Sequence, residues 1–122
     1  MDNHKKILVV DDDEVILEAF KFTLSDAGYD VTTITKDGKI LQRNLKKVKP
    51  NLIILDVLLS GSDGRTIARN IRGTEKTKNI PIIMISAHPD AKDSTIAAGA
   101  NEFLAKPFDI DDLLGLVKKY AY

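Results

Sequence analysis

The sequence predicts an α/β fold in which a parallel sheet of five strands is covered by helices on both faces. Two observations predict it. Short apolar runs, rich in β-branched residues, alternate along the chain with stretches of helical periodicity. Most of these runs also end directly in a charged or hydroxyl-bearing residue. A repeated strand–helix–strand order gives parallel strands joined by right-handed crossovers. Because no linker, internal repeat or low-complexity stretch interrupts it, residues 1–122 are expected to form one domain.

The five apolar runs are the predicted strands. Their continuous apolar character is typical of strands that are buried on both faces of a sheet. The run Val-Thr-Thr-Ile at 31–34 is the most polar of them and therefore suits an edge of the sheet. The predicted strands cover residues 7–10, 31–34, 52–55, 82–85 and 103–105.

Helices are expected between and after these strands, at about residues 14–27, 39–48, 65–72, 92–98 and from 111 onward. Gly28 supplies a stop for the first helix, and the second must end before Pro50. The 3.6-residue period gives the first and last helices an apolar face toward the core. These faces consist of Ile16, Phe20, Thr23, Leu24 and Ala27 in the first helix and of Ile110, Leu113, Leu114 and Val117 in the last.

Composition excludes several classes of function. Hydrophobic residues make up 43% of the chain and charged residues 30%, which is ordinary for a soluble globular domain. The 18 basic residues balance the 18 acidic ones, so no net field favours direct binding of nucleic acid or an anionic membrane. The absence of cysteine excludes disulfides and thiolate chemistry. The first apolar run is too short for a signal peptide or a membrane span, so we expect a cytoplasmic protein without membrane insertion.

Polar residues directly follow four of the predicted strands. They are Asp11, Asp12 and Asp13 after the first strand, Asp56 after the third, Ser86 after the fourth and Lys106 after the fifth. Because carboxyl ends of parallel strands meet at the edge where such sheets bind ligands, these side chains are expected to lie together. Acids before a helix also serve as N-caps, and we expect Asp13 to do so. Capping needs only one acid, whereas this run has three.

Charge repulsion argues that the acid cluster has a function. If Asp56 lies beside Asp11 and Asp12, two carboxylates about 4 Å apart repel by about 4 kcal/mol at an effective dielectric of 20. A hard divalent cation or the ammonium group of Lys106 would offset this repulsion. A cis peptide bond before Pro107 could aim that ammonium group inward. The cluster is therefore interpreted as a site for a divalent cation and a phosphoryl group.

In their order and spacing, these motifs resemble the receiver domain of two-component response regulators over almost the full length of the chain. The matching segments are residues 7–12 with the acid pair, Asp56 with Asp63 and Gly64, Ser86 with Ala87, Gly99 and Ala100 with Phe103, and Lys106 with Pro107 and Phe108. The resemblance implies a doubly wound, flavodoxin-like (βα)5 domain with strand order 2-1-3-4-5. It also implies a phosphorylation switch that catalyses only its own phosphorylation and dephosphorylation. Because the resemblance covers almost the whole chain, we expect no attached output domain.

The resemblance implies a role for each residue of the cluster. Asp56 would be the nucleophile that accepts a phosphoryl group from a phosphohistidine. Ser86 and Lys106 would contact the phosphoryl oxygens. Movement of Ser86 would let Phe103 swing inward and remodel the face formed by the fourth helix, fifth strand and fifth helix. The ligands of Mg²⁺, with Mn²⁺ as an alternative ion, would be Asp11, Asp12, Asp56 and the backbone carbonyl of Leu58.

The resemblance further implies three kinds of partner. These are a sensor histidine kinase or histidine phosphotransfer protein, a downstream target protein and, after phosphorylation, a second copy of the chain. Val15, Ala19 and Phe22 share one flank of the first helix. They form either a partly buried helix edge or an apolar patch that docks the partner carrying the phosphohistidine.

A few positions depart from the family pattern or favour one alternative. Leu59 and Ser60 stand where the family usually has Met-Pro, and apolar Leu58 is expected to slow loss of phosphate. Leu58 also argues against an aspartyl phosphatase, which carries a second acid at that position. A non-phosphorylated pseudo-receiver that acts only through protein contacts is the alternative function. The shared face of the third helix formed by Arg65, Arg69 and Arg72 is interpreted as solvated.

Overall fold

The computed structural model describes residues 5–35, 45, 47, 49–59 and 62–121. Its central sheet has five parallel strands in the order β2-β1-β3-β6-β7. When only these five strands are counted along the chain, this is the order 2-1-3-4-5, which confirms the expected topology. The strands are β1 (Lys6–Val10), β2 (Asp30–Ile34), β3 (Leu52–Asp56), β6 (Ile82–Ser86) and β7 (Glu102–Ala105).

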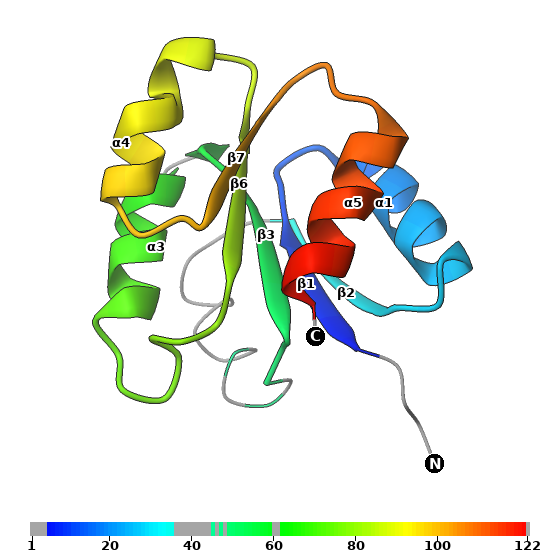
Figure 1. The fold of residues 1–122 in the computed structure, drawn as a ribbon, viewed down its shortest axis with the longest axis horizontal. Coiled ribbons are helices and arrows are strands. Elements are labelled where there is room, and N and C mark those ends of the chain that lie inside the picture. Colours follow the sequence, from blue (N-terminus) through cyan, green and yellow to red (C-terminus); the bar gives the residue numbers. More distant parts are fainter. Residues whose placement is uncertain (1–4, 36–44, 46, 48, 60–61, 122) are drawn as a thin grey trace.

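Helices lie on both faces of this sheet, with α1 and α5 on one face and α3 and α4 on the other (Figure 1). α1, α3 and α4 start and end within one residue of their expected ranges, and α5 starts one residue before its expected start. The helix expected at 39–48 falls mostly outside the described residues, although Leu45 and Lys47 are described and helical. The helices are α1 (Glu14–Asp26), α3 (Gly64–Arg72), α4 (Lys92–Ala97) and α5 (Ile110–Tyr120), and the 3-10 turn η1 (Pro89–Ala91) precedes α4.

Alternate strand residues contribute to two separate cores. In β1, Ile7 and Val9 pack in the core beneath α1 and α5, whereas Leu8 and Val10 pack in the core on the α3 side. All four side chains are almost completely buried. Burial on both faces is why the central strands are apolar without interruption. The two cores hold the strand ends in a rigid frame.

The predicted apolar faces of α1 and α5 were partly wrong. The buried residues of α1 are Leu17, Phe20 and Leu24, whereas Ala27 is exposed beyond the end of the helix. The real stripe has the i, i+3, i+7 spacing but includes Leu17, which the predicted face omitted. In α5, Val117 is buried as expected, but Ile110 is 55% exposed because it lies at the first position of the helix.

One edge strand is less buried than we expected, and the structure contains a hairpin that we did not expect. β2 lies at one edge of the sheet, as predicted, and β7 lies at the other. All four residues of β7 are half-buried, because an edge strand lacks a neighbour on one side. A two-stranded antiparallel hairpin formed by β4 (Leu58–Leu59) and β5 (Ser62–Asp63) was not predicted. Strands of two residues are too short to give a periodic signal.

Candidate functional site

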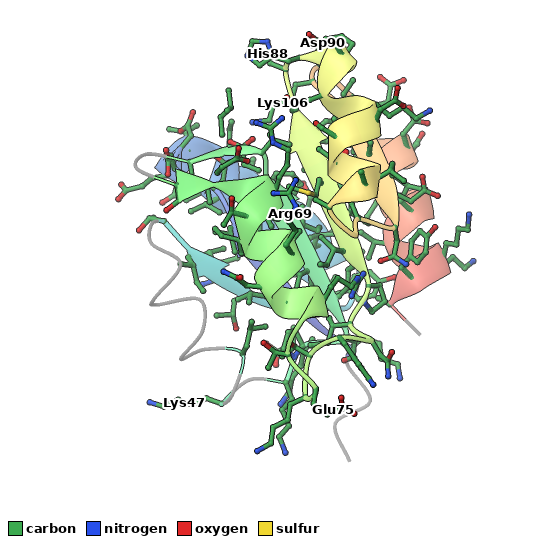
Figure 2. The ribbon with its side chains drawn as sticks, turned by 90° about the vertical axis from the view of Figure 1, so that its left-hand side faces the viewer. Lys47, Arg69, Glu75, His88, Asp90 and Lys106 are labelled. Carbon is green, nitrogen blue, oxygen red and sulfur yellow. The ribbon has the colours of Figure 1, made fainter. Side chains whose placement is uncertain are left out.

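Parallel pairing brings the polar strand ends to one edge of the sheet. Val10 pairs with Leu55, so the next residues, Asp11 directly after β1 and Asp56 at the end of β3, lie side by side. Across the next two strands, Asp56 pairs with Ile85 and Ser86 pairs with Ala105, the residue before Lys106. Figure 2 shows Lys106 at the same end of the molecule as His88, two residues beyond Ser86. The predicted gathering of these side chains at one edge is therefore present.

The ammonium group of Lys106 is placed between two carboxylates. Its Nζ lies 3.4 Å from Asp11 Oδ2 and 3.7 Å from Asp56 Oδ2. The side chains of Asp11 and Asp56 are only 4% and 13% exposed, so water screens these contacts poorly. The Lys106–Pro107 peptide bond is cis. The ammonium group of Lys106 thus neutralises part of the charge of the buried pair Asp11 and Asp56.

Burial raises the pKa of the Asp56 carboxyl above its ordinary value. The negative charge of Asp11 raises this pKa further, whereas Lys106 and the backbone N–H groups of Leu58 and Val57 lower it. Burial and the like charge prevail over the ammonium group and the hydrogen bonds. Ionised Asp56 is therefore held in an environment that penalises its charge, as expected of a carboxylate that binds a cation or reacts.

The three consecutive acids after β1 have separate roles. Asp13 is the N-cap of α1, and its Oδ1 accepts hydrogen bonds from the backbone N–H groups of Val15 and Ile16 at 2.9 and 3.4 Å. This confirms the expected cap. Asp11 is buried beside Lys106, and its Oδ1 accepts a hydrogen bond of 3.0 Å from the backbone N–H of Asp13. Asp12 lies between them and is half-buried.

Gly64 lets α3 begin directly against the strand that carries Asp56. A Cβ atom at this position would collide with the backbone oxygen of Asp56 and would lie 3.0 Å from the Met84 side chain. The Gly64 N–H instead donates a 2.7 Å hydrogen bond to the carbonyl of Val57. Asp63 caps α3 by accepting a hydrogen bond from the backbone N–H of Arg65. The Asp63-Gly64 pair thus holds the loop after Asp56 in place.

The hydroxyl group of Ser86 is held by its own loop. Ser86 is 2% exposed, and its Oγ accepts a 2.9 Å hydrogen bond from the backbone N–H of His88. It lines a polar cavity of about 250 Å³ together with Leu58 and Arg65. Phe103 is half-buried in β7, opposite Met84 of β6. The two expected switch residues therefore lie on adjacent strands.

The flank of α1 singled out in the sequence is exposed. Val15 and Phe22 are each 76% exposed, and Ala19 is exposed between them. The interpretation of this flank as a partly buried helix edge was therefore wrong. Ala19 also lines an apolar groove of about 320 Å³, whose other wall includes Pro107 and Phe108 after β7. An apolar surface thus extends from α1 to the loop that carries Lys106.

The interpretation of the α3 arginines as a solvated face was wrong for two of the three. Arg72 donates hydrogen bonds to the backbone oxygens of Gly99 and Lys78 at 2.9 Å each and of Ile80 at 2.6 Å, and to Asn101 Oδ1 at 2.6 Å. Arg65 pairs with Asp63 and also reaches Ser94 on α4. Arg69 is exposed, as expected. No local signal marks Arg72, because two of its acceptors lie 27 and 29 residues further along the chain.

The donor groups at this edge fit Mg²⁺. In the part of the chain that the structure describes, no three acidic or histidine side chains gather closely enough to enclose an ion by themselves. Mg²⁺ does not require such a cage, because it usually keeps several waters and takes one or two carboxylates together with substrate phosphates. Asp11 and Asp56 offer hard oxygen ligands of this kind at one edge of the sheet, where both approach Lys106 Nζ.

A family model described as the response regulator receiver domain matches residues 7–118. The chain belongs to this family. A receiver is a signalling module rather than a conventional enzyme, and receivers work with histidine kinases. The match covers all the strands and helices described above except the first residue of β1 and the last two residues of α5. No helix in the described part of this receiver is long and apolar enough to cross a membrane.

Curated relatives extend well beyond a receiver. The chain is 36% identical over 115 residues to the DNA-binding dual master transcriptional regulator RpaA of Synechocystis, covering 93% of the chain but 47% of that protein. It is 37% identical over 118 residues to the transcriptional regulatory protein GltR of Pseudomonas aeruginosa, covering 95% and 48%. The chain therefore spans about half the length of the curated relatives it matches.

Solved structures resemble the receiver over its full length. A putative response regulator from Chloroflexus aurantiacus is 36% identical, with a TM-score of 0.92 and 98% of each chain covered. The response regulator TrrA from Thermotoga maritima, solved in complex with Mg²⁺ and a beryllium fluoride, is 33% identical, with a TM-score of 0.85 and 95% and 98% covered. A receiver of a Pseudomonas aeruginosa sensor histidine kinase has a magnesium ion in its active-site cleft. It is 29% identical, with a TM-score of 0.86, and the match covers 97% of this chain and 98% of that one.

Proposed function

We propose that this receiver accepts a phosphoryl group on Asp56 from a phosphohistidine, in a reaction that depends on Mg²⁺, and signals the change through protein contacts. The observation that carries the proposal is the position of Lys106 Nζ, within 3.4 Å of Asp11 and 3.7 Å of Asp56. Two buried carboxylates repel each other, and nothing in the fold requires them to lie together, so their placement around one ammonium group indicates a function. A site that gains a phosphoryl group needs positive charge in place beforehand.

The chemistry follows from charge and positioning. An oxygen of Asp56 forms the new P–O bond while the P–N bond to the donor histidine breaks, and the imidazole nitrogen keeps the electron pair. Asp11, Asp12, Asp56 and the Leu58 carbonyl would hold Mg²⁺, directly or through water, and the bound ion would neutralise the phosphoryl charge. Lys106 lies where its ammonium group can pair with a phosphoryl oxygen. Phosphoryl transfer requires mainly such positioning and charge stabilisation from a protein.

The response to phosphorylation would begin at Ser86. Its hydroxyl group, which accepts a hydrogen bond from the His88 N–H, would turn to donate one to a phosphoryl oxygen. Such a shift would leave space for Phe103 and change the surface formed by α4, β7 and α5. We propose that a downstream target protein, or a second phosphorylated copy, contacts this surface. Ile96 of α4 is 43% exposed there and offers an apolar contact.

The partner that carries the phosphohistidine would dock on the apolar flank of α1. Val15 and Phe22 are both 76% exposed on the same flank of α1, and contiguous exposed apolar patches are typical of interaction sites. The groove between α1 and the Lys106 loop is continuous with this flank through Ala19. A sensor kinase or phosphotransfer protein that presents its histidine from a helix would place it beside Asp56 from this side.

A mass measurement tests the acceptor role. Incubation with a small phosphodonor and Mg²⁺ should add the mass of one phosphoryl group to the wild-type protein. Asp56→Asn should show no addition, and Asp13→Asn should retain it because Asp13 only caps α1. If the wild type gains no mass, or if Asp56→Asn gains it equally, the proposal is wrong. The first of these results would favour a pseudo-receiver that acts through protein contacts alone.

A further inference from the structure

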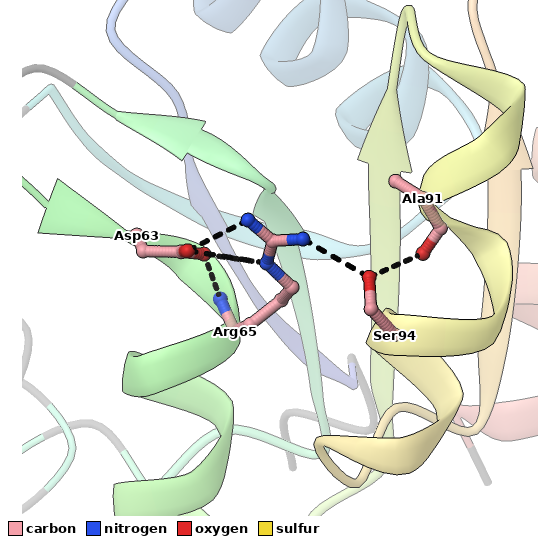
Figure 3. A network of polar contacts seen from close by, with 4 residues as sticks. All are labelled: Asp63, Arg65, Ala91 and Ser94. Carbon is pink, nitrogen blue, oxygen red and sulfur yellow. Dashed lines mark hydrogen bonds and ion pairs between the residues drawn. The ribbon is translucent and has the colours of Figure 1, made fainter.

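A polar bridge joins the loop after Asp56 to helix α4 (Figure 3). Arg65 Nη1 donates a 3.0 Å hydrogen bond to Ser94 Oγ, which lies in the first turn of α4. The Ser94 hydroxyl in turn donates a 2.9 Å hydrogen bond to the backbone oxygen of Ala91, the last residue of η1. The bridge therefore spans 29 residues of sequence and holds both η1 and α4.

The guanidinium end of this bridge is firmly anchored. Arg65 Nε and Nη2 donate hydrogen bonds of 2.9 and 2.8 Å to the two carboxylate oxygens of Asp63. Such two-point pairing restricts a guanidinium group in both position and orientation. Asp63 is itself restrained, because it caps α3 and pairs with Leu58 in the β4–β5 hairpin. The bridge thus connects the phosphoacceptor loop to α4 through side chains that are held at both ends.

The bridge lies beside the residue expected to move. Ser86, Arg65 and Ser94 all line the polar cavity of about 250 Å³. Between Ser86 and Ser94 the chain runs through His88, whose N–H holds the Ser86 hydroxyl, and through Ala91, which Ser94 holds. Movement of the Ser86 hydroxyl toward Asp56 would draw it away from the His88 N–H at the start of the intervening loop. The bridge restrains that same loop from its far end.

We infer that Arg65 is a positioning residue that acts through Ser94 to retain the loop between β6 and α4 in the arrangement in which Ser86 bonds to His88. The inference rests on the proposed phosphoacceptor function of Asp56. Arg65 would thereby set how readily the Ser86 hydroxyl becomes available to the phosphoryl group. It does not touch the reacting atoms.

The expected effect is a change in population. If the bridge is made only in the resting arrangement, its removal increases the fraction of molecules that can bind a phosphoryl mimic, and the apparent affinity rises by the same factor. The loss of one such hydrogen bond predicts roughly a fivefold gain. Binding of Mg²⁺ alone should not change in Ser94→Ala, because this variant keeps the Arg65–Asp63 pair and the hairpin that carries Leu58.

Isothermal titration with beryllofluoride in saturating Mg²⁺ tests the inference on three variants. Ser94→Ala removes the acceptor, and Arg65→Met removes the donor but keeps the bond between Ser94 and Ala91. Arg69→Met is the matched control, because it removes an exposed arginine from the same helix. We expect roughly fivefold tighter beryllofluoride binding in the first two variants and no change in the control. The Mg²⁺ affinity of Ser94→Ala and of Arg69→Met should equal that of the wild type.

Two results would overturn the inference, and they differ from a failure of the proposed function. Unchanged or weaker beryllofluoride binding by Ser94→Ala, with normal binding by the wild type, refutes the restraining bridge and leaves the acceptor role intact. Should Arg65→Met fold poorly because Asp63 loses its partner, Ser94→Ala still decides, since it preserves that pair. A wild type that binds no beryllofluoride and gains no phosphoryl mass refutes both proposals together.

Discussion

Replacement of Arg72 by alanine should destabilise the domain by about 3 kcal/mol, although this residue lies far from Asp56. Its guanidinium group donates four hydrogen bonds that connect the end of α3 to the turn before β7 and to the segment before β6. Bonds from a charged donor contribute about 1.5–3 kcal/mol each when buried and far less when exposed. Two of the four, those to Gly99 and Ile80, are partly buried and two are exposed. We therefore count about 1.5 kcal/mol for each partly buried bond and little for the others.

Urea unfolding at constant pH measures this effect directly. We expect an unchanged slope, a lower midpoint and a melting temperature lower by about 10 °C for a domain of this size. Arg72→Lys keeps the charge but cannot reproduce the planar set of donors, so it should recover only part of the loss. Arg69→Ala, on the exposed side of the same helix, should change stability by less than about 0.5 kcal/mol. If Arg72→Ala is no less stable than Arg69→Ala, these bonds do not hold the two segments together and our estimate is refuted.

Three further predictions concern the site. Burial raises the pKa of Asp56, so without Mg²⁺ the wild type should lose stability as the pH rises from the ordinary aspartate range through this raised pKa. Asp56→Asn, which cannot ionise, should not show this loss. Equal urea midpoints for the two proteins at neutral pH would contradict the raised pKa. Leu58, 55% exposed and lining the cavity beside Ser86, should shield the acyl phosphate from water, so Leu58→Asn should lose phosphate faster, and equal decay rates would refute this role. Phe22→Glu should slow transfer from a cognate phosphohistidine partner by about tenfold, the effect of losing roughly 1.4 kcal/mol of apolar contact, without slowing phosphorylation by a small donor. Parallel losses with both donors would place Phe22 in the fold rather than in docking.

Features that depend on short stretches of sequence could be predicted. The runs around Ile7 and Ile82 give strands because their residues are apolar on both faces, and Asp13 caps because an acid before a helix meets free N–H groups. The gathering of Asp11, Asp56 and Lys106 also follows, since parallel strands must end at a common edge. In each case the physical cause acts within a few residues or through the topology as a whole.

Features that depend on particular long-range contacts could not be predicted. The face of α3 that carries Arg65 and Arg72 has the same charge pattern as a solvated face, and only packing against α4 and the turn before β7 turns two of its members inward. Ile110 has the period of a core residue but lies at the start of its helix, where no sheet surface is available to cover it. Periodicity shows which side of a helix is apolar, but it does not show how far along the helix the sheet extends to cover that side.

The pairing of Lys106 with Asp11 joins residues 95 positions apart in the chain. During synthesis, Asp11 and Asp56 are both made long before their compensating ammonium group, which arrives only with the last strand of the sheet. An incomplete chain would therefore carry the acids without the cation that makes them tolerable together. Competence to accept a phosphoryl group would then coincide with completion of the fold, so that unfinished or truncated copies of the domain could not intercept a signal meant for finished ones.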